Sequence, residues 1–254
     1  MTYFNFLLIF LGIPLLGLVG LVWRDRHLGI RLPAHLQTWN PVWVVVAHIG
    51  LALGYTTPWD NYLVANGIWY YQPHLISGVL IGWVPLEEYL FFVLQTIVSG
   101  AWVVFLLKRF APHTAFVPNQ RVRFGLSGVV GIIWLASCLW LASGHQPATY
   151  TNLILSWALF PILIQCVFGA DILWHYRLPI SLATLSTTLY LSVSDSFAIQ
   201  AGTWEISPVY SFELFLLGRL PVEEFLFFLL TNLLVAVGVS LVLAVASHRR
   251  LLGK

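Results

Sequence analysis

The stretch PLEEYLFFVLQTIVSGAWVVFLL (residues 85–107) and its counterpart PVEEFLFFLLTNLLVAVGVSLVL (residues 221–243) set the architecture of this chain. In each, a pair of glutamates follows a proline and precedes a long run of mostly apolar residues. Proline suits the first turn of a helix, and acidic side chains there lie at the positive end of the helix dipole. A helix of about 20 apolar residues crosses the hydrocarbon core of a bilayer. The two stretches therefore predict two membrane-spanning helices that carry paired acids at the same end.

The composition of the whole chain is that of a membrane protein. Of its 254 residues, 59% are hydrophobic and only 9% are charged, and the mean hydropathy is +0.85. Soluble domains contain about 45–50% apolar and about 25% charged residues, so this class is excluded. The 12 Lys and Arg residues nearly balance the 10 Asp and Glu residues, so we expect no nucleic-acid partner. The two cysteines, Cys138 and Cys166, lie in apolar runs where a disulfide framework is not expected.

Seven windows are apolar enough to be transmembrane helices, and they cover residues 3–22, 41–57, 86–107, 124–143, 152–169, 179–194 and 222–246. Basic residues favour cytoplasmic loops. Of the 12 basic residues, 11 lie on one predicted side: Arg24, Arg26, Arg31, Lys108, Arg109, Arg121, Arg123, Arg177, Arg249, Arg250 and Lys254. Only Arg219 lies on the other. We therefore predict an all-α, multi-pass protein of the cell membrane with seven transmembrane helices, its N-terminus outside and its C-terminus in the cytoplasm.

The chain also contains an internal repeat. Upstream of the two Pro-x-Glu-Glu segments, an aspartate, a glycine and a tryptophan recur at the same spacing: Asp60, Gly67 and Trp69, then Asp195, Gly202 and Trp204. Further upstream, Asp25 matches Asp171, and the matched segments follow one another at offsets of 146, 135 and 136 residues. We predict two parallel three-helix repeats, residues 1–110 and 147–254, joined by residues 111–146 with a central helix.

Eight of the ten acidic residues map to the predicted non-cytoplasmic end. Acids at membrane depth are costly and usually face a bundle interior, where they mark a functional site. Adjacent helical residues point about 100° apart, so Glu87 and Glu88 cannot form a dyad with each other. One of them can face a cavity while the other faces a neighbouring helix or loop, and the same holds for Glu223 and Glu224. The simplest alternative is that both pairs cap helix ends in water.

Each of these acids has a phenylalanine one helical turn later, on the same face: Phe91, Phe92, Phe227 and Phe228. A carboxylic acid in an apolar pocket stays protonated and can donate its proton. The faces of aromatic rings stabilise a nearby cation by roughly 0.5–2 kcal/mol each. Such a site suits protonation of a carbon–carbon double bond, followed by rearrangement of the carbocation.

Other residue types point to fewer functions. The eight histidines lack metal-ligand spacing, and the chain has neither a GxGxxG fingerprint nor an aspartate-rich motif, so we expect no metal and no dinucleotide cofactor. Asp25 and Asp171 are expected to pair locally with Arg31 and Arg177. Aromatic residues near the predicted span ends resemble an interfacial belt, with substrate contact as the alternative: Trp23, Trp39, Trp59, Trp69, Tyr70 and Tyr71.

The segment TPWDNYLVANGIW (residues 57–69), followed by PLEEYLFF (residues 85–92), resembles the non-flavin lycopene β-cyclases. The second copy, with Asp195, Gly202, Trp204 and PVEEFLFF (residues 221–228), resembles them too. In that family two small membrane polypeptides form a heterodimer in some bacteria. They are fused in one chain in archaea and other bacteria, and are fused further to phytoene synthase in fungi. The resemblance spans both repeats, so this chain looks like the two-unit fusion.

The resemblance implies cofactor-independent cyclisation of the linear C40 hydrocarbon lycopene to γ-carotene and β-carotene, in carotenoid biosynthesis. An acid protonates the terminal double bond, the cation closes a six-membered ring, and a base removes a proton. Carried over by motif, the candidate acids and bases are Glu87, Glu88, Glu223 and Glu224, with Asp60 and Asp195 assisting. The candidate substrate contacts are Phe91, Phe92, Phe227, Phe228, Trp69 and Trp204. The expected partners are lycopene or another linear carotenoid from the bilayer, membrane lipids and other carotenoid enzymes.

Two questions stay open at the level of the sequence. Each repeat can make one ring, or both repeats can contribute to one composite site that is used twice. The function class also has alternatives, because a proton-coupled transporter places carboxylates inside a repeated bundle as well. A passive carotenoid-binding protein is a third class. A transporter predicts uptake that depends on a pH gradient, and neither alternative changes the pigment chemically.

Overall fold

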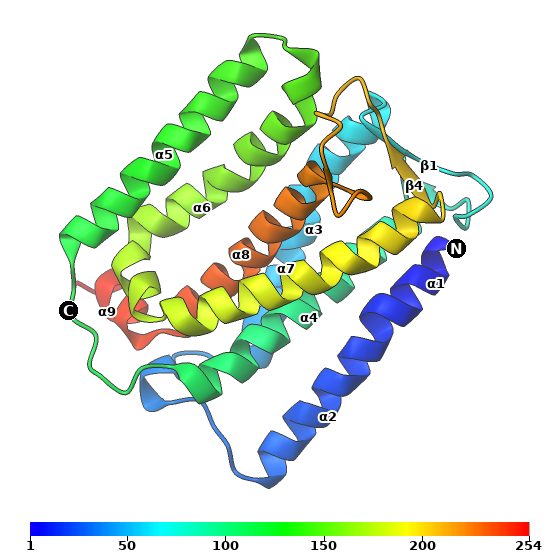
Figure 1. Ribbon diagram of the computed structural model, residues 1–254. Helices are drawn as coiled ribbons and strands as arrows, with labels where there is room; N and C mark the ends of the chain where they lie inside the picture. Colours follow the sequence, from blue (N-terminus) through cyan, green and yellow to red (C-terminus); the bar gives the residue numbers. More distant parts are fainter. Residues whose placement is uncertain (254) are drawn as a thin grey trace.

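A computed structural model describes residues 1–253 as a bundle of long helices with short strands at one end (Figure 1). The helices are α1 (Tyr3–Leu7), a π-helix (Leu8–Gly12), α2 (Ile13–His27), α3 (Pro41–Ala65), α4 (Leu86–Phe110), α5 (Gln120–Ala142), α6 (Thr149–His175), α7 (Arg177–Gln200), α8 (Val222–Leu243) and α9 (Val245–Leu251). Two 3-10 turns cover Ala34–Leu36 and Gln146–Ala148. The strands are β1 (Trp69–Tyr71), β2 (Leu80–Ile81), β3 (Val84–Pro85), β4 (Trp204–Ile206), β5 (Phe215–Leu216) and β6 (Leu220–Pro221). The N-terminus lies at the end that carries the strands, and the C-terminus lies at the other end.

Within residues 1–253, six segments are long and apolar enough to cross a membrane, which confirms the all-α, multi-pass class. They are Tyr3–His27, Ala34–Ala65, Leu86–Phe110, Gln120–Ala142, Gln146–His175 and Val222–Leu243. A helix lies in every predicted window, but α7, rich in Ser and Thr, is not among these six. The last window is predicted to end at about residue 246, and the helix in it ends three residues earlier. There, α8 stops at Leu243 because Ala244 is extended (φ −71°, ψ 124°) before α9 begins.

Local sequence signals explain where several helices begin and end. The side-chain oxygens of Asn40 and Asn119 accept hydrogen bonds from backbone N–H groups two and three residues later, at 2.9 and 3.1 Å, and so cap α3 and α5. Gly67 and Gly202 follow α3 and α7 with φ of +65° and +67°, a conformation that favours glycine over residues with a Cβ atom. The same turn therefore leads from α3 into β1 and from α7 into β4.

Strands β1 and β4 tie the two halves of the chain together. They pair antiparallel, with Tyr70 opposite Glu205. The Tyr70 hydroxyl donates a hydrogen bond to Glu205 at 2.9 Å, which raises the pKa of that hydroxyl, and the Gln72 side chain donates to the same carboxylate at 2.8 Å. The hairpins β2–β3 and β5–β6 stand directly before α4 and α8. This end of the bundle is therefore held by backbone pairing as well as by helix packing.

Helices α4 and α8 form the centre of the bundle. In each, 61% of the most apolar window is buried, against 11% in α5. Buried polar side chains join them: the Ser99 hydroxyl donates to Asn232 at 2.6 Å, and the Gln95 amide donates to Thr231 at 3.0 Å. A polar group without a partner is costly in apolar surroundings, so these bonds favour contact between the two helices. The glutamate pairs at the starts of α4 and α8 consequently meet at one end of the bundle.

The other end is held by buried ion pairs that differ from the predicted ones. Asp25 is fully buried and pairs with Arg109 at 2.5 Å and with Lys108 at 3.1 Å. Asp171 pairs with Arg250 at 2.7 Å. The predicted local pairs with Arg31 and Arg177 are therefore wrong. Folding brings the end of α4 to Asp25 and α9 to Asp171, and spacing along the chain does not reveal such long-range contacts.

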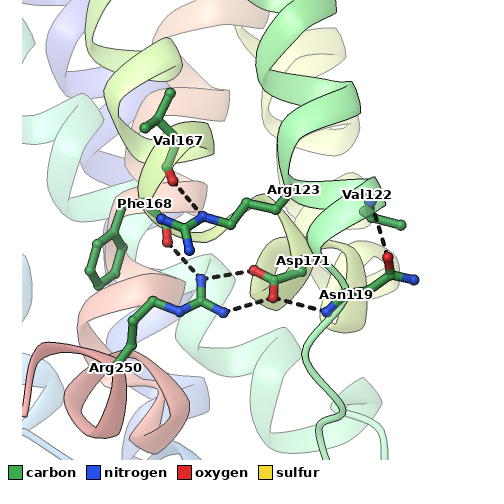
Figure 2. A network of polar contacts seen from close by, with 7 residues as sticks. All are labelled: Asn119, Val122, Arg123, Val167, Phe168, Asp171 and Arg250. Carbon is green, nitrogen blue, oxygen red and sulfur yellow. Dashed lines mark hydrogen bonds and ion pairs between the residues drawn. The ribbon is translucent and has the colours of Figure 1, made fainter. Parts of the chain in front are cut away.

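Figure 2 shows how α9 is anchored through Arg250. The two terminal nitrogens of its guanidinium bind the two carboxylate oxygens of Asp171 at 2.8 and 2.7 Å. The terminal nitrogen Nη1 of Arg250 also donates to the carbonyl of Phe168 at 2.6 Å. The backbone N–H of Asn119 donates to Asp171 at 3.2 Å from the start of α5. This single carboxylate thus connects α5, α6 and α9.

We expect Arg250→Ala to lower the free energy of unfolding by roughly 1–3 kcal/mol, because it leaves a buried carboxylate without its charged partner. The measurement is the thermal unfolding midpoint of the purified protein in detergent. The matched control is Arg249→Ala, which removes the neighbouring exposed arginine. An equal loss of stability in both variants would contradict this account of the anchor.

Candidate active site

A small cavity lies where the first turns of α4 and α8 meet α1, α7 and the strands β1 and β4. Its volume is about 20 Å³, enough for about one water molecule. Two carboxylic acids from α4 and α8, one from α7, two tyrosines and five other aromatic rings line it: Glu88, Glu224, Asp195, Tyr3, Tyr71, Trp69, Phe91, Trp204, Phe227 and Phe228. Acids from both halves of the chain therefore share one aromatic compartment, which we call the acid cavity.

Glu88 accepts two hydrogen bonds in this cavity, both on Oε2. The Tyr3 hydroxyl donates at 2.5 Å and the Tyr71 hydroxyl donates at 2.9 Å. Burial raises the pKa of the Tyr71 hydroxyl well above its ordinary value, and the nearby carboxyl groups of Asp60 and Glu88 act in the same direction. Tyr71 therefore stays protonated and remains a donor to Glu88.

Glu224 has a different set of partners. The Tyr150 hydroxyl donates to Oε1 at 2.6 Å. The residue that corresponds to Tyr71 in the second half is Ile206, which has no hydroxyl. Within residues 1–253, Oε2 of Glu224 receives no hydrogen bond from the protein. The two glutamates thus occupy matching places with unequal hydrogen bonding.

Asp60 and Asp195 are also buried, and they also differ from each other in their hydrogen bonding. Trp204 donates its indole N–H to Oδ1 of Asp195 at 3.0 Å, and Oδ2 has no partner in the described part of the chain. Asp60 is fully buried, and neither of its oxygens has a partner among residues 1–253. The indole N–H of Trp69, the counterpart of Trp204, is likewise unpaired there. Unpaired buried polar atoms are rare, and four of those in the described part of the chain belong to Asp60, Asp195 and Trp69.

The first glutamate of each pair faces a loop. The N–H and the hydroxyl of Ser77 donate to the two oxygens of Glu87 at 2.5 and 3.0 Å. The N–H of Phe212 donates to Glu223 at 2.9 Å, and the Thr151 hydroxyl donates to the same oxygen at 3.3 Å. Both Glu87 and Glu223 are fully buried, so neither caps a helix in water. They hold the loops that precede α4 and α8.

The structure brings most of the predicted site residues together. Glu88, Glu224, Asp195, Phe91, Phe227, Phe228, Trp69 and Trp204 line the acid cavity. Asp60 is buried but is not part of its lining, and Phe92 lies in a neighbouring cavity. Glu87 and Glu223 point away, as expected of adjacent positions on a helix. Which of these residues are catalytic stays a prediction.

The sequence did not point to Tyr3, Tyr71 or Tyr150 as partners of the glutamates, and Tyr71 was expected only in the interfacial belt or in contact with substrate. A signal was present for two of them, because Tyr3 and Tyr150 occupy the same place in the motifs TYFN (residues 2–5) and TYTN (residues 149–152). Nothing comparable marks Tyr71, whose counterpart is Ile206. Its position beside Glu88 depends on how β1 folds back over α4.

Proton transfer is the chemistry for which the cavity is equipped. Among residues 1–253, no group of three or more His, Cys, Asp and Glu side chains is arranged to hold a metal ion. The cavity instead combines carboxyl groups, phenol hydroxyls and ring faces. Carboxyl groups can give and take protons, and ring faces can surround a cation.

The chain aligns with known proteins over nearly its whole length. The lycopene beta-cyclase of Halobacterium salinarum is 38% identical over 244 residues, which make up 94% of this chain and 95% of that protein. The chain belongs to the lycopene β-cyclase family. The family expected from the Pro-x-Glu-Glu segments and their Asp, Gly and Trp context is therefore confirmed. No family model matches the chain, and no solved structure matches it.

Fungal members of the lycopene cyclase family match as well. The bifunctional lycopene cyclase/phytoene synthase of Leptosphaeria maculans is 36% identical over 216 residues, which cover 80% of this chain and 36% of that protein. That of Sporisorium reilianum is 34% identical over 192 residues, which cover 72% of this chain and 28% of that protein. In both, the lycopene cyclase-like chain corresponds to only a part of a longer polypeptide.

We expect Glu223→Ala to loosen the loop before α8, because it removes the acceptor of the Phe212 N–H. A typical hydrogen bond contributes roughly 0.5–1.5 kcal/mol, so amide exchange in residues 207–214 should quicken by a factor of about two to ten. Hydrogen–deuterium exchange with mass spectrometry measures this. Glu213→Ala is the control, since Glu213 is an exposed residue of the same loop. Equal exchange in both variants would show that Glu223 does not hold the loop.

Proposed function

We propose that this protein is a lycopene β-cyclase, which closes the ends of lycopene or a related linear carotenoid into β-ionone rings. One observation carries the proposal: Glu88 and Glu224, one from each half of the chain, face the same small aromatic cavity. The relative from Halobacterium salinarum, which is a lycopene beta-cyclase, supports the choice of substrate. The product is an isomer of the substrate, so the reaction requires proton transfers and no net oxidation.

We place seven helices across the cell membrane, with α7 joining the six apolar segments. Its 24 residues extend over about 36 Å, which is enough to span a bilayer. Several of its polar side chains bond inside the bundle: Thr187 donates to the carbonyl of Ala183 at 2.7 Å, and Thr188 donates to that of Phe228 at 3.3 Å. The distribution of basic residues supports an outer N-terminus and a cytoplasmic C-terminus.

We also propose that residues 1–110 and 147–254 are parallel repeats related by an approximate twofold axis, with α5 in the connection of residues 111–146. Contacts that recur in both halves support this. The N–H of Tyr3 donates to the carbonyl of Leu75, and the N–H of Tyr150 donates to that of Tyr210, both at 2.9 Å. The hydroxyls of the same two tyrosines bind the two cavity glutamates. Tyr70 and Glu205, which are counterparts, face each other in the β1–β4 pair.

The hydrogen bonds favour different roles for the two glutamates. Glu224 accepts one hydrogen bond, from Tyr150, and its other oxygen is free to carry a proton, so we assign it as the acid. Glu88 accepts two, from Tyr3 and Tyr71. Because hydrogen bonds from hydroxyl donors stabilise a charged carboxylate, we assign Glu88 as the base.

The reaction then follows in three steps. Glu224 gives its proton to the terminal double bond of the carotenoid, which leaves a tertiary carbocation. A neighbouring double bond attacks this cation, closes the six-membered ring and moves the positive charge onto a ring carbon. Glu88 removes a proton from the adjacent carbon, and the electrons of that C–H bond form the ring double bond. The cavity has room for about one water molecule, and we propose that the proton returns from Glu88 to Glu224 through it.

We expect the aromatic rings around the acid cavity to stabilise the carbocation intermediate. Phe91 and Phe228 meet at a centroid distance of 6.3 Å, and Trp69 lies 6.4 Å from Phe227. Each ring face stabilises a cation by roughly 0.5–2 kcal/mol. The rings also exclude bulk water, which would otherwise capture the cation as an alcohol.

The first test is the pigment profile of lycopene-accumulating cells that express the chain, by chromatography and absorption spectrum. We expect cyclised carotenes, because the acid cavity holds both an acid and a base. Cells with the empty vector are the control. Unchanged lycopene, with the folded protein verified in the membrane, would overturn the proposal and favour a transporter or a passive carotenoid-binding protein.

A second test separates one composite site from two. If one cavity supplies acid and base for both rings, Glu88→Gln and Glu224→Gln should each lower both ring closures by about 100-fold or more. Glu87→Gln and Glu223→Gln are the controls and should retain most of the activity, because they face loops. A one-ring product at the wild-type rate from either cavity variant would show that each repeat makes one ring.

A further inference from the structure

A second cavity lies next to the acid cavity, between α3, α4, α6 and α8. Its volume is about 350 Å³, and residues such as Ala52, Tyr55, Phe160 and Ile164 line it, so we call it the α3–α6 crevice. Phe227 lines both this crevice and the acid cavity. The acid cavity itself has room for about one water molecule, far less than the end of a C40 chain requires.

A row of aromatic rings runs from the outer side of the crevice to the acid cavity. Tyr55 stacks on Trp157 at 5.6 Å, and Trp157 stacks on Trp59 at 4.3 Å, each with 15° between the ring planes. Trp59 is parallel to Phe227 at 6.0 Å, and Phe227 meets Trp69 in the wall of the acid cavity at 6.4 Å. Flat parallel rings match the shape of a conjugated polyene.

The outer side of the crevice opens toward the surface that a bilayer covers. Leu51 is 66% exposed, Ile164 is 55% exposed and Phe160 is 44% exposed, and all three line the crevice. The Tyr55 hydroxyl donates to the carbonyl of Trp157 at 2.8 Å across the opening. A hydrocarbon substrate dissolved in lipid therefore meets an apolar opening that leads inward along the aromatic row.

The corresponding seam in the other half, between α7 and the α1–α2 helix, has the same bridge but different aromatic packing. The Tyr190 hydroxyl donates to the carbonyl of Phe10 at 3.0 Å, as Tyr55 does to that of Trp157. Phe10 stacks on Phe197 at 5.9 Å with 6° between the planes, and the fully buried Phe6 packs beside it at 5.3 Å.

Two further positions distinguish the seam from the crevice. Ser194 stands where the crevice has Trp59, so the aromatic row is interrupted. Trp102 is the counterpart of Gly238, which lies on the side of the crevice. The indole N–H of Trp102 donates to the Ser186 hydroxyl across the seam at 2.8 Å. From these differences we infer that this seam is not a second entrance.

We propose that the α3–α6 crevice binds the linear polyene and is the single entrance by which both of its ends reach the acid cavity. This inference rests on the proposed function. Because one entrance serves one acid cavity, a chain that has received its first ring must leave and return with its other end first. The one-ring product is therefore released between the two ring closures.

The test uses Ala52→Trp, which fills the crevice, with Ala136→Trp as the matched control on the exposed face of α5. The purified variants are assayed in phospholipid vesicles loaded with lycopene or, separately, with the one-ring product. We expect Ala52→Trp to lower kcat/KM about tenfold or more for both substrates, since the reacting end no longer reaches its place. We expect Ala136→Trp to remain within twofold of the wild type, a factor of about two being within ordinary variation for a surface change.

Two outcomes would overturn the inference. Wild-type rates in Ala52→Trp on both substrates would mean that the crevice holds a lipid acyl chain or nothing. A loss on lycopene alone, with the one-ring product still cyclised at the wild-type rate, would mean that a second entrance exists. Thermal unfolding of Ala52→Trp and Ala136→Trp in detergent checks that both variants are folded.

A binding measurement separates this inference from the proposed function. Lycopene that co-purifies with Glu224→Gln is compared with lycopene that co-purifies with Glu224→Gln carrying Ala52→Trp as well. We expect about tenfold less pigment in the double variant, whether or not the wild type is a cyclase. An inactive wild type that binds lycopene in the crevice would overturn the proposed function alone, whereas equal pigment in both variants would overturn the crevice.

Discussion

The structure depends on one constraint: four carboxyl groups, those of Glu88, Glu224, Asp60 and Asp195, are buried at one end of a bundle that lies in a membrane. Burying a carboxyl group in such surroundings costs free energy unless other groups hydrogen-bond to it. Acids that are kept there usually have a function. Tyrosine hydroxyls supply hydrogen bonds to the two glutamates. This requirement explains why α1 and α6 begin with tyrosines that reach the first turns of α4 and α8. It also explains why the paired strands β1 and β4 close that end of the bundle.

The acidic turn that recurs in the sequence, at residues 85–92 and 221–228, lies beside the same cavity in both copies, and the two copies differ in detail. Tyr71 corresponds to Ile206, so one glutamate accepts two hydroxyl hydrogen bonds and the other accepts one. Trp59 corresponds to Ser194, so the aromatic row is continuous on one side only. A symmetric frame therefore carries an asymmetric site. This asymmetry suits the proposed division of roles, in which one glutamate donates a proton and the other accepts one.

Much of the fold was predictable because membrane helices depend on length and apolarity, both of which can be read along a chain. The paired acids, their phenylalanines and the Asp, Gly and Trp of each repeat were predictable for the same reason, since they recur at fixed spacing. The ion pairs at the other end of the bundle were not predictable from the sequence. Asp25 lies six residues from Arg31 in the chain, yet it pairs with Lys108 and Arg109, because the ends of α2 and α4 meet only after the helices pack. The end of α8 at Leu243 was not predictable either, because the apolar run in the sequence continues past the extended residue Ala244.

The sequence by itself determined the class of protein, the approximate positions of its helices, the family, and the glutamate pairs around which the site is built. These properties depend on composition, periodicity and motifs, which are local. Only the tertiary structure decided which glutamate of each pair faces the cavity and which holds a loop, and which tyrosines approach them. It also decided that acids from both halves share one cavity, and that a larger apolar cavity lies next to it between α3, α4, α6 and α8. Those outcomes depend on the rotation of each helix about its axis and on the contacts between residues more than 70 positions apart, such as Tyr150 and Glu224.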